Sequence, residues 1–157
     1  MSIDINGIAH VYVTVQDFAR CRPFYGKLLA FLKMECLVDT PQLYYCVGGR
    51  TGFAIRAAAA GYREIAFDQY RAGLHHVCFR ARSREDVDAL AAHVLDIGAK
   101  VIKPPAEDDW AQGYYSVLFE DPCGTRLEAN YVPGKGNLDA AVDLPLPTRM
   151  QRLLSEP

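Results

Sequence analysis

Two histidines and one glutamate in this sequence have side chains that suit metal coordination. His10 and His76 each begin a short segment in which apolar and polar residues alternate, and Glu128 lies in a third such segment. Imidazole nitrogens and carboxylate oxygens are common ligands of divalent metal ions, and a site with three protein ligands leaves coordination positions open for a substrate. The three residues therefore predict one divalent metal site whose open coordination positions could bind a substrate.

Strand alternation predicts which side chains share a face, because successive residues of a strand point to opposite sides. In the first segment the face opposite the apolar one carries His10, Tyr12 and Thr14. In the second segment His75 falls on the apolar face, which a helix should cover, and the opposite set is His76, Cys78 and Arg80. In the third segment the opposite set is Arg126, Glu128 and Asn130. The alternation predicts that both imidazoles and the carboxylate point away from the helices.

The elements that position these residues follow the same order twice. In the first half a strand at residues 8–15 precedes a helix that Asp17 caps and that contains Pro23, which should kink or delay it. Three short apolar runs follow, at 37–38, 43–47 and 53–57, and turn residues separate them. The first half therefore predicts the order β-α-β-β-β.

The second half restarts after an irregular connector at residues 58–73. A strand at 74–81 precedes a helix that Ser83 caps and Gly98 ends. The remaining strands are expected at three places: 99–102, 114–120 and 125–132. We predict an α+β fold of two tandem βαβββ modules, 5–57 and 74–133, that form a cupped mixed sheet with the helices on its outer face.

The composition limits the classes of protein and partner. Half of the residues are hydrophobic (50%) and 23% are charged, as in ordinary globular domains. Lys and Arg number 17 against 19 Asp and Glu, so the formal net charge of −2 provides no excess of positive charge for phosphates or anionic lipids. We expect a small-molecule substrate and neither nucleic acid nor a membrane as partner, with a homodimer as a candidate assembly.

The five cysteines are widely spaced, odd in number and without a C-x-x-C pair, so neither a disulfide framework nor a cysteine zinc cluster is expected. Reduced thiols indicate a cytoplasmic chain. No targeting or membrane-spanning segment is evident. Residues 134–157 contain several prolines and glycines and predict a surface tail or arm, which either docks on its own domain or exchanges with a partner subunit.

Over residues 5–133 the sequence resembles the vicinal oxygen chelate superfamily, the group of glyoxalases, bleomycin-resistance proteins and extradiol dioxygenases. The first module carries the resemblance at residues 10–17 and in Phe24-Tyr25 followed by Leu29-Ala30-Phe31. The second carries it at residues 73–79, in the helix at 87–98 and at 121–128, the most specific string.

The resemblance implies a metal site on the first and last strands of each module, with His10, His76 and Glu128 at three of its four places. The fourth place falls on Ala54, where many lactoylglutathione lyases have a ligand. The remaining set looks like the two-histidine, one-carboxylate triad of the extradiol dioxygenases, which iron, zinc, manganese or nickel could occupy.

The resemblance therefore implies a metal-dependent enzyme, dioxygenase-like or lyase-like, whose small oxygen-rich substrate chelates the metal. The alternatives are a lactoylglutathione-lyase-like isomerase, which would need another base such as Tyr114, and a non-catalytic binder of an antibiotic. The sequence assigns no catalytic residue beyond the metal ligands. Its candidates for contact with substrate are Tyr12, Arg80, Tyr114, Arg126 and Asn130, with Tyr44 or Tyr45, Trp110 and Tyr115 as further aromatic candidates.

Overall fold

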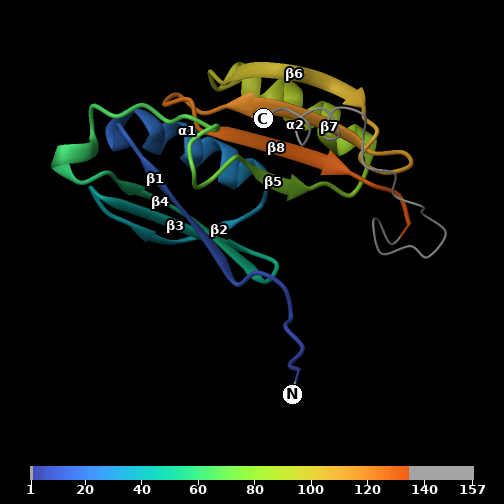
Figure 1. Ribbon diagram of the computed structural model, residues 1–157, viewed down its shortest axis with the longest axis horizontal. Coiled ribbons are helices and arrows are strands. Elements are labelled where there is room, and N and C mark those ends of the chain that lie inside the picture. The colour runs from blue at the N-terminus through green and yellow to red at the C-terminus, as the bar shows by residue number, and fades with distance from the viewer. Residues whose placement is uncertain (1, 135–157) are drawn as a thin grey trace. The chain divides into compact units, whose positions relative to one another are not determined.

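A computed structural model describes residues 2–134 of the chain, which divide into two compact units (Figure 1). The first unit contains the chain up to Tyr70 together with the turn Asp121–Thr125, and the second contains Arg71–Glu120 and the chain from Arg126 on. The predicted tail lies, apart from Gly134, outside the described residues.

The first unit is a four-stranded mixed sheet with one helix. Its elements are β1 (His10–Val15), α1 (Phe18–Phe31), β2 (Glu35–Asp39), β3 (Leu43–Gly48) and β4 (Thr51–Ala57). The strand order is β1-β4-β3-β2, in which β1 runs parallel to β4 and the other neighbours are antiparallel. A short 3-10 helix, η1 (Ala60–Tyr62), lies in the connector.

The second unit repeats this arrangement. Its elements are β5 (Val77–Arg80), α2 (Arg84–Asp96), β6 (Lys100–Glu107), β7 (Tyr115–Glu120) and β8 (Arg126–Tyr131). The order is β5-β8-β7-β6, and β5 runs parallel to β8. The predicted α+β class and the order β-α-β-β-β in both halves are confirmed.

Both helices begin at the caps that the sequence indicates. The Asp17 carboxylate accepts a hydrogen bond from the Arg20 amide at 3.0 Å, and the Ser83 hydroxyl accepts one from the Asp86 amide at 3.1 Å. These bonds satisfy amides that have no partner inside a helix. Pro23 lies inside α1, which still starts directly after its cap, so the expected delay of this helix does not occur.

Each unit buries the apolar face of its sheet, and each helix packs on its own sheet, α1 on β4 and α2 on β6, β7 and β8. Fully buried side chains of the first unit include Val15, Tyr25, Leu28, Leu29, Phe53 and Ile55. Those of the second include Val87, Val94, Val117, Phe119 and Leu127. The opposite face of each sheet is left for the polar residues.

Two local expectations were wrong. β5 begins at Val77, so His75 precedes the strand; it is exposed and does not share the face covered by the helix. Alternation sets side-chain direction only within a strand, and it does not extend to the residues before it. β6 also continues to Glu107, well beyond the predicted end at Ile102, through two register shifts against β7.

Asp121 organises the turn between β7 and β8. Its Oδ1 accepts hydrogen bonds from the amides of Cys123 at 2.8 Å and Thr125 at 2.9 Å, and its Oδ2 accepts one from the Tyr25 hydroxyl at 2.8 Å. Asp121 is buried, and burial raises the pKa of its carboxyl above the ordinary value. The bond to Tyr25 of α1 explains why this turn belongs to the first unit.

Among the described helices, none combines the length and the apolar character that crossing a membrane requires.

Candidate metal-binding site

Glu128 is placed at the centre of the second sheet by the pairing of its strand. β8 lies between β5 and β7, and Glu128 pairs with Cys78 on one side and Leu118 on the other. Paired residues share a face of a sheet, and α2 covers the other face, where Val117 and Leu127 are buried. The predicted position of Glu128 on the face away from the helix is therefore confirmed.

His76 meets this carboxylate directly. Its Nε2 lies 3.0 Å from Oε2 of Glu128, and its Nδ1 lies 2.7 Å from Nδ1 of His75. A hydrogen bond between two Nδ1 atoms requires that one ring carries the proton and the other accepts it. This hydrogen bond fixes the orientation of the His76 ring. Metal-binding histidines often make such a bond through the ring nitrogen that does not bind the metal.

Tyr114 holds the other carboxylate oxygen, since its hydroxyl donates a hydrogen bond to Oε1 of Glu128 at 2.6 Å. Burial alone would raise the pKa of Glu128, but hydrogen bonds from His76, Tyr114 and Ser116 outweigh it and hold that pKa below its ordinary value. Burial and the adjacent carboxylate raise the pKa of Tyr114. Glu128 is therefore an ionised acceptor, and Tyr114 is a protonated donor.

The donor pair fits a divalent metal. The 3.0 Å separation of Nε2 and Oε2 is that of a hydrogen bond, and an imidazole nitrogen and a carboxylate oxygen are the kinds of atom that could hold a divalent metal. Within residues 2–134, no group of three or more His, Cys, Asp or Glu side chains lies close enough together to hold a metal ion. His76 and Glu128 are thus two potential ligands within the second unit, and His10 belongs to the first unit.

The two modules have the same strand register, which identifies their equivalent positions. Tyr12 pairs with Ala54 between β1 and β4, as Cys78 pairs with Glu128 between β5 and β8. Ala54 therefore occupies the position of Glu128, which is where the resemblance puts the fourth place. The first module offers His10 at the start of β1 and no carboxylate at that position.

Aromatic rings occupy the corresponding face of the first module. Tyr45, which pairs with Ala54, stacks on Tyr12 with ring centroids 6.0 Å apart, and the His10 ring meets Tyr12 edge-on at 5.3 Å. A β-carbon at Gly52 would clash with the Tyr45 ring, so the small residue leaves space for this ring. We call His10, Tyr12 and Tyr45 the aromatic face of the first module.

The structure distinguishes between the remaining aromatic candidates. Tyr44 points toward α1, where the Arg22 guanidinium lies 3.5 Å from its ring centre, so Tyr45 is the tyrosine on the open face. Tyr115 donates a hydrogen bond to Asp88 of α2 at 2.8 Å, which leaves Tyr114 as the tyrosine beside Glu128. Trp110 is half-buried in the segment before β7.

The polar candidates differ in their surroundings. Arg80 is exposed, and Asn130 is half-buried and pairs with it across β5 and β8. Arg126 donates a hydrogen bond through Nε to Glu120 at 2.7 Å, an ion pair that neutralises much of the charge it could offer an anionic substrate. Sequence reasoning misplaced His75, because strand periodicity gives no information about the loop before β5.

Comparison with known proteins agrees with this architecture. The model of the Glyoxalase/Bleomycin resistance protein/Dioxygenase superfamily matches residues 7–129. No curated protein matches the sequence significantly. Similar solved structures include a glyoxalase/bleomycin resistance protein from Albidiferax ferrireducens T118, which is 24% identical with a TM-score of 0.65 and coverage of 80% of this chain and 98% of that chain.

Two further structures extend the comparison. A glyoxylase/bleomycin resistance protein/dioxygenase domain from Frankia sp. EAN1pec is 25% identical, with a TM-score of 0.65 and coverage of 82% and 98% of the two chains. A lactoylglutathione lyase from Agrobacterium tumefaciens is 20% identical, with a TM-score of 0.58 and coverage of 81% and 94%. With the family match over most of its length, this chain belongs to the glyoxalase/bleomycin resistance protein/dioxygenase superfamily.

Proposed function

We propose that this protein is a metal-dependent enzyme, dioxygenase-like or lyase-like, whose small substrate chelates a divalent metal through neighbouring oxygen atoms. The ligands are His76 and Glu128, with His10 as the third. The observation that carries the proposal is the 3.0 Å approach of His76 Nε2 to a buried, ionised Glu128 carboxylate. When bound, the metal would act as a Lewis acid that stabilises negative charge on substrate oxygens.

The protein's own residues support this role in separate ways. Tyr114 and His75 hold the two ligands in position, and such partners strengthen metal binding. Because the Tyr114 hydroxyl donates to Glu128 and its pKa is raised, Tyr114 is a poor candidate for a general base at neutral pH.

In the lactoylglutathione lyases that the sequence resembles, carboxylates on the last strands of both modules take part in isomerisation. This chain has Ala54 at one of these two positions, which weighs against that activity. The stacked rings of Tyr12 and Tyr45 instead favour a flat, aromatic substrate. An aromatic diol combines such a ring with two neighbouring oxygens. The same rings would also suit a binder of aromatic antibiotics, so the experiment must separate binding from turnover.

The test is elemental analysis of protein purified without added metal and then reconstituted with iron, zinc, manganese or nickel. We expect one metal ion per chain and oxygen uptake, or cleavage without oxygen, with a catechol as probe. Glu128→Ala should lower metal affinity by more than about 100-fold, beyond the usual effect of losing a residue that only orients a ligand.

Glu120→Gln is the matched control, because Glu120 lies on the same face of the sheet but pairs with Arg126. It should keep its metal. Isomerisation of a thiohemiacetal by the wild type would instead support the isomerase. Metal-free protein that binds an aromatic drug without turnover would leave only the binding function.

A further inference from the structure

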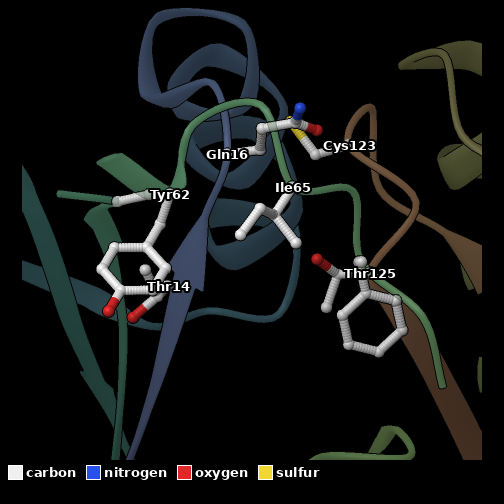
Figure 2. Close-up of a pocket in the computed structure, with 8 residues that line it drawn as sticks. Thr14, Gln16, Tyr62, Ile65, Cys123 and Thr125 are labelled. Carbon is white, nitrogen blue, oxygen red and sulfur yellow. The ribbon is translucent and has the colours of Figure 1, made fainter. Parts of the chain in front are cut away.

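A pocket of about 180 Å³ in the first unit is lined by none of the proposed metal ligands and by no residue of the aromatic face. Figure 2 shows side chains that line it from the end of β1, from the connector after β4 and from the turn 121–125. They include Thr14, Gln16, Tyr62, Ile65, Cys123 and Thr125. The pocket thus brings a cysteine thiol to the wall of a space that admits a small molecule.

A second thiol lies directly beside Cys123. Its Sγ is 3.0 Å from Sγ of Cys21, a residue of α1 that has no exposed surface. Both residues belong to the first unit, although 102 positions separate them in the chain. A disulfide bond is about 2.05 Å long, so a movement of about 1 Å would join the two sulfurs.

The two thiols differ in access. Cys123 is partly exposed and lines the pocket, whereas Cys21 is enclosed. Burial, together with Asp121 at 3.9 Å from its sulfur, raises the pKa of Cys21 and keeps it a thiol at neutral pH. A small oxidant that enters the pocket therefore meets Cys123 first, with Cys21 behind it.

Hydrogen bonds within the turn 121–125 hold Cys123 at the pocket. The Cys123 amide donates to Asp121 at 2.8 Å, and the Gly124 amide donates to the Asp121 carbonyl at 3.0 Å. The Tyr25 hydroxyl ties Asp121 to α1, the helix that also carries Cys21. The two sulfurs are thus held by one connected set of hydrogen bonds.

We propose that Cys123 is a peroxide-reactive thiol and that Cys21 resolves its oxidised form as a disulfide. In the first step the Cys123 sulfur attacks a hydroperoxide, the O–O bond breaks, and Cys123 sulfenic acid and an alcohol or water form. In the second step Asp121, whose Oδ2 lies 3.9 Å from the Cys21 sulfur, accepts the thiol proton, the Cys21 sulfur displaces the hydroxyl group, and a disulfide and water form. Two external thiols return the pair to its reduced state by exchange, and they become a disulfide themselves.

The experiment treats the folded protein with hydrogen peroxide, blocks remaining thiols, and maps it by trypsin digestion and mass spectrometry without reduction. The expected product is a cross-link between peptide 21–27 and peptide 101–126, lighter by about 2 Da than their sum and lost after reduction. Cys123→Ser should abolish the cross-link. Cys21→Ser should leave a sulfenic acid at Cys123 that dimedone labels.

Cys78→Ser is the matched control, because Cys78 is a thiol of the second unit, and it should form the cross-link as the wild type does. Cys36 and Cys46 face each other across β2 and β3, but both lie in the tryptic peptide 34–50. A disulfide between them therefore joins no two peptides. Oxidation confined to that peptide, or peroxide-treated protein without any 21–27 to 101–126 product, would overturn the proposal.

Discussion

At the residue scale, Glu128 shows how three neighbours give one carboxylate a defined state. His76 binds one oxygen, Tyr114 binds the other, and Ser116 adds a further hydrogen bond. Burial of an unpaired carboxylate would favour its neutral form, but these donors keep it ionised. The side chains around Glu128 therefore stabilise its ionised form.

Tyr114→Phe tests this arrangement. The change removes the hydroxyl that donates to Glu128 and leaves the ring, so the carboxylate should lose orientation while the sheet stays intact. We expect metal affinity to fall by about 10- to 100-fold, measured by titration with a competing chelator.

Tyr115→Phe provides the comparison. Tyr115 is the next residue in the chain, but its hydroxyl donates to Asp88 of α2 and not to Glu128. An equal loss of affinity in both variants, or no loss in Tyr114→Phe, would show that the phenol does not support the ligand.

Asp121 leads to a pH prediction. Burial raises its pKa in the folded state, so the folded protein binds this proton more tightly than the unfolded chain does. This contribution to stability is fully present at a pH below the pKa of Asp121 in the unfolded chain. It is lost as the pH rises through the higher pKa of Asp121 in the folded protein. We expect wild-type stability, relative to Asp121→Asn, to decrease as the pH rises above about 4, measured by urea unfolding. A constant difference between the two proteins over pH 3 to 7 would contradict it.

At the element scale, the two helices depend on caps that are local in sequence. Ser83 accepts the Asp86 amide at the start of α2, a helix that packs on three strands of its sheet. Ser83→Ala should lower the free energy of unfolding by about 1 kcal/mol, measured by urea denaturation. Ser83→Asp retains an acceptor and should restore most of the loss, whereas equal destabilisation by both variants would indicate another role for Ser83.

The strand faces show which aspects of the site are predictable. Alternation within β1 and β8 correctly placed Tyr12 and Glu128, since each position in a strand has a defined side. The same rule could not separate Tyr44 from Tyr45, because either register fits a short apolar run. Contact of Tyr44 with Arg22 of α1 resolved this, and such a contact depends on packing between segments.

At the scale of the whole molecule, the proposal takes one ligand, His10, from the first unit and two, His76 and Glu128, from the second. A ligand that binds only the folded protein stabilises it by about 2.7 kcal/mol at a free concentration of 100 times its Kd. For a chain of this size that corresponds to a rise in Tm of about 5–10 °C. Metal addition should raise the Tm of the wild type in differential scanning calorimetry.

In the same measurement His10→Ala should lose most of the rise. His93→Gln, which changes a histidine of α2, should retain it. If His10→Ala is stabilised as strongly as the wild type, the first module contributes no ligand and the metal site is confined to the second.

The sequence by itself determined the α+β class, the repeated order of elements and the face on which Glu128 lies, because caps, turns and periodicity act over a few neighbouring residues. Only the tertiary structure decided which side chains meet. His75 turns toward His76 in a loop without period, and Cys21 reaches Cys123 across 102 positions. The contact between the two cysteines follows from the packing of α1 against the turn 121–125, which no local pattern encodes.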